Sequence, residues 1–280
     1  MKRDRTELLL REPNIYKAFL ILALPVFGAN FMKAFNELVD TFFIGHVANS
    51  VAAQAGVSIS WPLLNIFASF QVGFGVAGVA VISQFLGAGR REHARENAGV
   101  LLAVAVLFGA ALTVFCLVCK RPILYLFGAS DVTYPYADDY LTVYILGTVF
   151  VMIGLGMNPF INAQGFSRMG MLTVALGAVV NIVLDPIFIF GLDMGVRGAA
   201  LATVISQACS AVWVLKFLTG KRAILRLRLA ALRLQAARVR EILALGTSGF
   251  VMSLTNSLVQ VLCNATLQVY GGDLYVGVMT

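Results

Sequence analysis

The chain has 280 residues, of which 59% are hydrophobic and only 12% are charged. A soluble domain contains about 45–50% apolar and about 25% charged residues, so this composition excludes an ordinary soluble domain and indicates a membrane protein. The formal net charge of +7 suits basic loops that lie against an anionic membrane surface, and we therefore expect no nucleic-acid partner.

Apolar residues fall in long blocks, and a block of about 20 residues crosses the roughly 30 Å hydrocarbon layer as a helix. Six complete blocks cover residues 18–44, 51–86, 98–118, 136–160, 171–190 and 198–218, and another begins near Ile242. The first block is too long for the apolar core of a cleavable signal and contains charged residues, so we expect it to remain as the first span. The sequence predicts an all-α membrane protein, with a six-helix transmembrane lobe followed by the beginning of a second, parallel repeat.

Basic residues indicate the orientation, because short loops that stay in the cytoplasm collect Lys and Arg. With the N-terminus inside, the inner segments hold Lys2, Arg3, Arg5, Arg11, Lys17, Arg90, Arg91, Arg95, Arg168, Lys221, Arg222, Arg226, Arg228, Arg233, Arg238 and Arg240. The outer segments hold only Lys120, Arg121 and Arg197. We expect a multi-pass protein of the plasma (inner) membrane, in contact with membrane lipids and with a cytoplasmic N-terminus.

The segment 221–241, KRAILRLRLAALRLQAARVRE, is the most basic part of the chain. Its apolar residues recur at spacings of three and four, namely Leu225, Leu229, Leu232, Ala236 and Val239. This pattern predicts an amphipathic helix on the inner membrane surface. A calmodulin target or a nucleic-acid patch has a similar pattern, but a position between two membrane spans favours an interfacial linker.

The sequence restarts after this linker, because NSLVQ at 256–260 echoes NELVD at 36–40. Six spans return the chain to the cytoplasm, so the two series are expected to be parallel repeats, as in many secondary transporters. We expect an N-terminal six-helix lobe at 1–220, an amphipathic cytoplasmic linker helix at 221–241 and the start of a C-terminal lobe at 242–280. The last segment ends within the second span of its repeat, which predicts a fragment of a longer protein.

The stretch NIVLDPIFIF at 181–190 places a carboxylate in an otherwise apolar span. Such a group is costly in hydrocarbon, so Asp185 is expected to face a partner or a wet cavity. Asn181 lies four residues earlier on the same helix face, and Pro186 leaves the carbonyl of Ile182 free and bends the helix. Oxygen ligands at a broken helix suit a cation such as sodium. The alternative is a protonated Asp185 that only forms a hydrogen bond with a neighbouring helix.

The first span carries a second polar stripe, because Lys33, Asn36, Glu37 and Asp40 follow one another at spacings of three and four. Lys33 and Glu37 can neutralise each other. Asp40 then lacks a local cation and is a second candidate for protonation or ion binding. Alternatively, this end of the span lies at the outer interface, where Glu37 and Asp40 are simply hydrated.

Four motifs stand together in this chain: LVDTFFIGHV in the first span, FLGAGRREHAREN in the first inner loop, NIVLDPIFIFG in the fifth span and GVRGAALATVISQ entering the sixth. In this combination the chain resembles the multidrug and toxin extrusion (MATE) family. The resemblance implies two six-helix lobes in a V shape and the export of small organic cations in exchange for sodium or protons. It implies no enzyme activity and no cofactor beyond the coupling ion, and we expect a monomer.

The resemblance also implies site residues. The cation site, for sodium or a proton, is expected to use Asp40, Asn181, Asp185, Thr203 and a backbone carbonyl near Ala199. Tyr140 and Asn158 are expected polar neighbours in the cavity, together with Asn36 and Glu37 of the first-span stripe. Pro25 is the expected hinge of the first span, and Pro186 is the second expected hinge.

Two other function classes remain as alternatives. An intramembrane aspartyl protease would use Asp40 and Asp185 as a pair that shares a proton, but FGLD at 190–193 lacks the first glycine of a Gly-x-Gly-Asp motif. A lipid-linked oligosaccharide flippase of related architecture would line its cavity with Arg for an anionic diphosphate. The predicted spans contain no Arg, and Lys33 is the one residue in them that favours the flippase.

Overall fold

The computed structural model describes residues 14–47, 50–227 and 236–278. These residues form helices and no strand: α2 (Ile15–Ile44), α3 (Ser50–Gly87), α4 (Arg91–Leu126), α5 (Tyr134–Leu146), α6 (Thr148–Ala163), α7 (Ser167–Pro186), the π-helix η1 (Ile187–Gly191), α8 (Gly195–Thr219) and α9 (Ala236–Val278). The all-α prediction is confirmed.

The helices are long and apolar enough for a multi-pass membrane protein. Among the described residues, six candidate spans are Ile15–Ile44, Ser50–Phe70, Arg91–Leu126, Ser167–Gly191, Gly195–Thr219 and Gly249–Gly271. A bent pair formed by α5 and α6 is a further candidate span. The predicted lobe with the start of a second series is therefore present.

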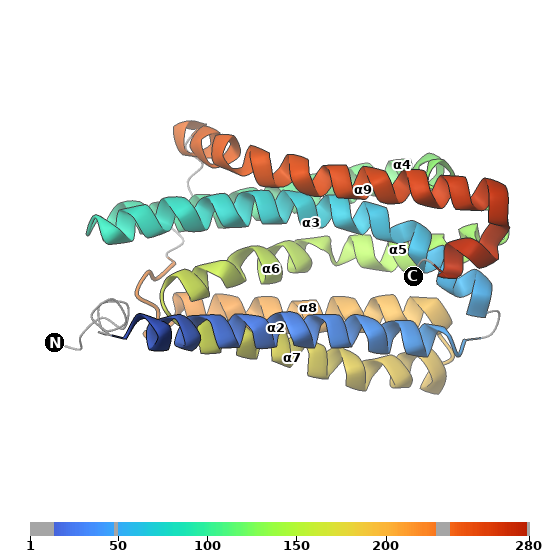
Figure 1. Ribbon diagram of the computed structural model, residues 1–280, viewed down its shortest axis with the longest axis horizontal. Helices are drawn as coiled ribbons and strands as arrows, with labels where there is room; N and C mark the ends of the chain where they lie inside the picture. Colours follow the sequence, from blue (N-terminus) through green and yellow to red (C-terminus); the bar gives the residue numbers. More distant parts are fainter. Residues whose placement is uncertain (1–13, 48–49, 228–235, 279–280) are drawn as a thin grey trace.

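The helices run up and down in one bundle, and the long axes of α2, α3 and α9 lie roughly parallel in Figure 1. Although α2 and α3 are consecutive, α2 packs mainly on α7, and α3 packs mainly on α9. The side of α2 away from α7 is largely apolar and exposed, with Phe31 72% accessible. An apolar exposed face of this kind suits contact with lipid.

The predicted fourth span, 136–160, is broken rather than continuous. α5 and α6 meet at Gly147 with an angle of 60° between them. A Cβ atom at Gly147 would lie only 2.4 Å from Cγ2 of Val204 in α8, so this close approach requires glycine. The sequence pattern misses the break because both halves are apolar.

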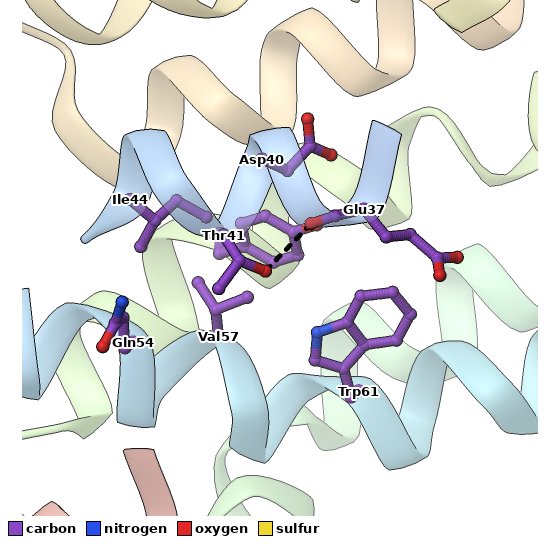
Figure 2. A pocket seen from close by; sticks show the side chains of 8 residues that line it. Glu37, Asp40, Thr41, Ile44, Gln54, Val57 and Trp61 are labelled. Atoms are coloured by element: carbon purple, nitrogen blue, oxygen red, sulfur yellow. Dashed lines mark hydrogen bonds between the residues drawn. The ribbon is translucent and has the colours of Figure 1, made fainter. Parts of the chain in front are cut away.

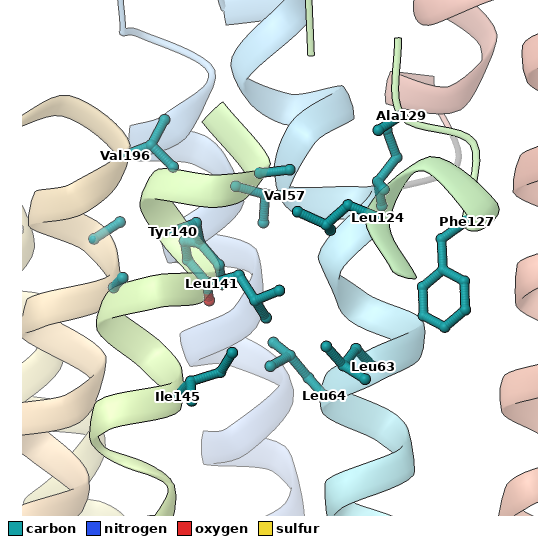
Figure 3. Packing of buried hydrophobic residues seen from close by; sticks show 14 of the residues in the cluster. Val57, Leu63, Leu64, Leu124, Phe127, Ala129, Tyr140, Leu141, Ile145 and Val196 are labelled. Carbon is teal, nitrogen blue, oxygen red and sulfur yellow. The ribbon is translucent and has the colours of Figure 1, made fainter. Parts of the chain in front are cut away.

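A buried apolar cluster stabilises the end of the bundle opposite the start of α2. Figure 3 shows Leu63 and Leu64 of α3 beside Leu141 and Ile145 of α5. Leu141 and Ile145 are completely buried. Burial of a Leu or Ile side chain stabilises a protein by about 1.5–3 kcal/mol relative to leaving the side chain exposed to water. Here the packing fixes the position of α5 beside the polar interior of the bundle.

The predicted linker helix at 221–241 differs from the structure. Residues 221–227 are not helical, residues 228–235 lie outside the described residues, and α9 begins at Ala236. The backbone N–H of Leu225 donates to Oε1 of the buried Gln164 at 2.9 Å, and the N–H of Leu227 donates to the carbonyl of Leu218 at 3.0 Å. These contacts hold apolar residues of the segment against the bundle. The same residues are then not available for the apolar face of a helix on the membrane surface.

Candidate functional site

The two membrane carboxylates come from helices that pack together. Asp40 lies in the last turn and a half of α2, and Asp185 is the residue before the end of α7. The two carboxyl groups lie within interaction range of each other, and Glu37 is a further charged neighbour of Asp40. Two carboxylates from distant parts of the chain thus form one polar group inside the bundle.

A relay of amides connects α2 to Asp185. Nδ2 of Asn36 donates to Oδ1 of Asn181 at 2.5 Å, and Nδ2 of Asn181 donates to Oδ1 of Asp185 at 3.1 Å. Asn181 and Asp185 are 1% and 0% exposed, respectively. The i, i+4 pair predicted from the sequence is therefore in direct contact, and the two hydrogen bonds fix its orientation.

Three oxygen atoms of this group are buried without a hydrogen-bond partner: Oδ1 of Asn36, Oδ1 of Asp40 and Oδ2 of Asp185. An unsatisfied buried oxygen is costly, and buried polar groups usually have a partner. Carboxylate and amide oxygens can be satisfied by a proton or by a hard cation. The residues present therefore fit the chemistry of a sodium or proton site.

Pro186 changes the helix type directly after Asp185. α7 ends at this proline and continues as η1, in which the N–H of Leu192 donates to the carbonyl of Ile187 at 2.9 Å. A proline cannot donate to the carbonyl four residues earlier, and single-turn π segments often accompany such interruptions at functional sites. A Cβ at Gly198 would lie 2.7 Å from the carbonyl carbon of Phe188, so α8 packs tightly on the widened turn.

A cavity of about 430 Å³ lies between α2, α3, α5, α6, α7 and α8. Its lining includes most of the predicted site residues, namely Pro25, Asn36, Glu37, Asp40, Tyr140, Asn158, Asn181 and Thr203. Asp185 and Ala199 are not part of this lining. Asp185 is completely buried and accepts its hydrogen bond from Asn181, which does line the cavity. The carbonyl of Ala199 accepts a hydrogen bond from Oγ1 of Thr203 at 3.0 Å.

Asp40 also borders a second, small pocket of about 20 Å³, shown in Figure 2. The pocket is lined by Glu37, Asp40, Thr41, Ile44, Gln54, Val57, Trp61 and Tyr140. Its volume is about that of one water molecule. Asp40 is thus accessible both from the large cavity and from a pocket that extends toward the end of α2 at Ile44.

Some cavity residues were not predicted. Asn162 and Gln207 line the cavity, and Oδ1 of Asn162 and Oε1 of Gln207 are buried without a hydrogen-bond partner. Asn162 follows Asn158 by four residues, and Gln207 follows Thr203 by four. Because residues four apart share a helix face, this spacing was the signal that would have identified both.

The predicted pair in the first span is present. Nζ of Lys33 lies 3.7 Å from Oε1 of Glu37, and both side chains face the large cavity. Tyr140, which is buried, lies among Glu37, Asp40 and Asp185 and stacks on Tyr144 with ring centroids 6.1 Å apart.

Comparisons with known proteins agree with this architecture. Residues 25–187 match the model of the family described as MatE. The multidrug export protein MepA of Staphylococcus haemolyticus is 28% identical over 269 residues, which is 96% of this chain and 59% of that protein. MepA of Staphylococcus aureus is 25% identical over 257 residues, which is 92% of this chain and 57% of that protein.

Solved structures give the same result. The MATE multidrug transporter DinF-BH, solved as a complex, matches with a TM-score of 0.91 and 34% identity over 99% of this chain and 61% of that chain. An outward-facing MATE family transporter of the MOP superfamily matches with a TM-score of 0.85 and 25% identity, covering 100% of this chain and 61% of that chain. The chain spans about three fifths of the length of the curated relatives it matches.

Proposed function

Because this chain belongs to the MATE family, whose model matches more than half of its residues, we propose that the protein is a secondary active antiporter. It exports small organic cations in exchange for sodium ions or protons by alternating access. The family and its MepA relatives support multidrug efflux. No step of this exchange calls for a cofactor or for enzyme chemistry.

The observation that carries the proposal is a carboxyl pair of which one member, Asp40, lines the large cavity. Asp40 and Asp185 lie within interaction range of each other, Asn181 donates to Asp185 and is itself held by Asn36, and three buried oxygens have no hydrogen-bond partner. A cavity of about 430 Å³ lies within the range of about 300–1,000 Å³ that holds drug-sized molecules. One site for a small cation and one space for a larger molecule thus share Asp40.

Coupling follows from competition for this site. A ligand shifts an equilibrium between two arrangements only through its different affinities for them. Sodium or a proton at Asp40 and Asp185 removes the repulsion between the carboxylates, whereas an organic cation in the cavity needs a free carboxylate. Thr203 borders the same cavity and supplies a hydroxyl oxygen, with Ala199 as its present acceptor.

The proposed orientation has the N-terminus in the cytoplasm and the carboxyl pair nearer the outer side of the plasma (inner) membrane. The basic residues support it. Arg90, Arg91 and Arg168 lie next to the α3–α4 and α6–α7 connections, at the bundle end where α2 begins, whereas Lys120 and Arg197 lie near the end of α4 and the start of α8, toward the other end. Cytoplasmic loops are richer in Lys and Arg. We propose that the unit of function is a monomer.

Transport in proteoliposomes tests the proposed function, with the protein in its natural full length and with sodium and pH gradients imposed separately. Movement of a cationic dye against its gradient is expected under at least one of the two ion gradients. Dye movement that is independent of both gradients contradicts antiport. Translocation of a polyprenyl diphosphate without dye transport would instead support the flippase class.

A further inference from the structure

Lys33 occupies an unusual depth for a basic side chain. It lies 18 residues after the start of α2 at Ile15 and 11 residues before its end at Ile44, which corresponds to about 27 Å and about 16 Å along the helix axis. The residue is therefore near the middle of the span. A cation at this depth requires a partner or a hydrated cavity.

The cavity supplies the hydrated surroundings, and Glu37 supplies only a loose partner. Lys33 is the one Lys, Arg or His among the described residues that line the large cavity. Its Nζ lies 3.7 Å from Oε1 of Glu37, and the two side chains are 60% and 43% exposed. This separation exceeds the usual hydrogen-bond length of about 2.7–3.2 Å, so the ammonium keeps donors for another acceptor.

Lys33 and Asp40 present opposite charges on the same face of α2. They are seven residues apart, which places them almost in line and about 10 Å apart along the axis. Both line the cavity, whose lining also includes apolar side chains such as Trp61, Phe67 and Met152. The lining thus offers a fixed cation at Lys33, a carboxylate at Asp40 and apolar side chains from the facing helices, with Asn36 and Glu37 on α2 between the two charges.

We propose that Lys33 binds the carboxylate of amphoteric organic molecules whose cationic end faces Asp40. This inference rests on the proposed function, and it assigns to Lys33 the selection of molecules that carry a carboxylate as well as a positive charge. A simple cation gains nothing from Lys33, whose charge repels it. A zwitterion satisfies both charges, because its carboxylate can approach Lys33 to hydrogen-bond distance, which is closer than the 3.7 Å at which Glu37 lies.

A matched pair of dyes separates the two ligand classes: a rhodamine with a free carboxyl group and the ethyl ester of the same rhodamine. Binding is measured by dye anisotropy with the 280-residue chain in phosphatidylcholine nanodiscs, at a pH where the carboxyl is ionised. The chain has two tryptophans. In a Trp213→Phe background, Trp61 of the cavity lining is the only one left, and its quenching reports that the dye is in the cavity.

Lys33→Met is expected to weaken binding of the acid by about tenfold, which corresponds to about 1.4 kcal/mol. Binding of the ester is expected to stay unchanged or become tighter, because a repelling charge is gone. Lys33→Arg is expected to retain binding of the acid. Lys216→Met, at an exposed position in the last turn of α8, is the matched control and is expected to change neither affinity.

Three outcomes overturn the proposal. The first is an equal effect of Lys33→Met on the acid and the ester, with a thermal melt that shows the variant folded. The second is loss of the Lys33→Met effect when phosphatidylglycerol is added to the nanodiscs, which would assign Lys33 to a lipid headgroup. The third is absence of binding of either dye, which contradicts the proposed function as well, whereas binding of the ester alone contradicts only the role of Lys33.

Discussion

Replacing Asp185 with asparagine tests the carboxyl pair with the least change in shape. Asn181 now donates to Oδ1 of Asp185 at 3.1 Å, and the amide oxygen of an asparagine can accept the same hydrogen bond. The new amide nitrogen would stand where Oδ2, now without a partner, lies. Asp185→Asn therefore keeps the relay but removes one charge and one cation ligand.

The size of the effect follows from the charge that is lost. One unit charge at about 4 Å from a monovalent cation contributes about 4 kcal/mol at an effective dielectric constant of about 20. Desolvation of the carboxylate offsets part of this, and hydrogen bonds to charged groups contribute a net of about 1.5–3 kcal/mol. We expect the affinity for the coupling cation to fall by roughly 10- to 100-fold, while the thermal stability is retained because the shape and the hydrogen bond from Asn181 are kept.

Ion-driven efflux of a cationic dye is the assay, measured in membranes where expression of the variant is verified. Asp193→Asn is the matched control, because Asp193 is exposed, lies eight residues further along the chain and has a φ of 53° that asparagine tolerates. We expect Asp185→Asn to abolish coupled efflux and Asp193→Asn to leave it unchanged. Efflux at the wild-type rate in Asp185→Asn would refute the reasoning and favour a purely structural role for Asp185.

Three further predictions concern packing and topology. Gly147→Ala should lower the melting temperature by about 2–10 °C, because a Cβ at this position would lie 2.4 Å from Val204 and overpacking costs about 1–3 kcal/mol. Recovery of the melting temperature in the double variant with Val204→Ala would identify this contact as the cause. Nδ2 of Asn65 donates to Oε1 of Gln260 at 2.7 Å between α3 and α9, so a double-mutant cycle to alanine in detergent should give a coupling of about 0.6 kcal/mol, and additive effects would argue against a stabilising bond. A cysteine introduced in place of Arg91 should react in intact cells only with a membrane-permeant reagent. Labelling by an impermeant reagent would contradict the proposed orientation.

Local periodicity predicted the parts of the site that lie within one helix. The contact of Asn181 with Asp185 and the pairing of Lys33 with Glu37 follow from a spacing of four residues. The bond from Asn36 to Asn181 could not be predicted in this way, because it depends on which helices pack together. The break in the fourth span could not be predicted for the same reason. Glycine is required at position 147 because Val204 of α8 packs against it, and not because of the sequence of α5 or α6.

The position of the carboxyl pair links its charge to the packing of α2. α2 packs mainly on α7 and makes few contacts with α3 or α8, so the interface that holds Asp40 and Asp185 is its main attachment within the described residues. Two ionised carboxylates at about 4 Å repel each other by about 4 kcal/mol at an effective dielectric constant of about 20, which is comparable to the packing of one or two large apolar side chains. If the pair binds the coupling ion as proposed, an occupied site favours the docked α2, and an empty, ionised site favours its displacement. Pro25 lies 15 residues before Asp40 in the same helix and already lacks one backbone hydrogen bond, so α2 can bend there at the lowest cost.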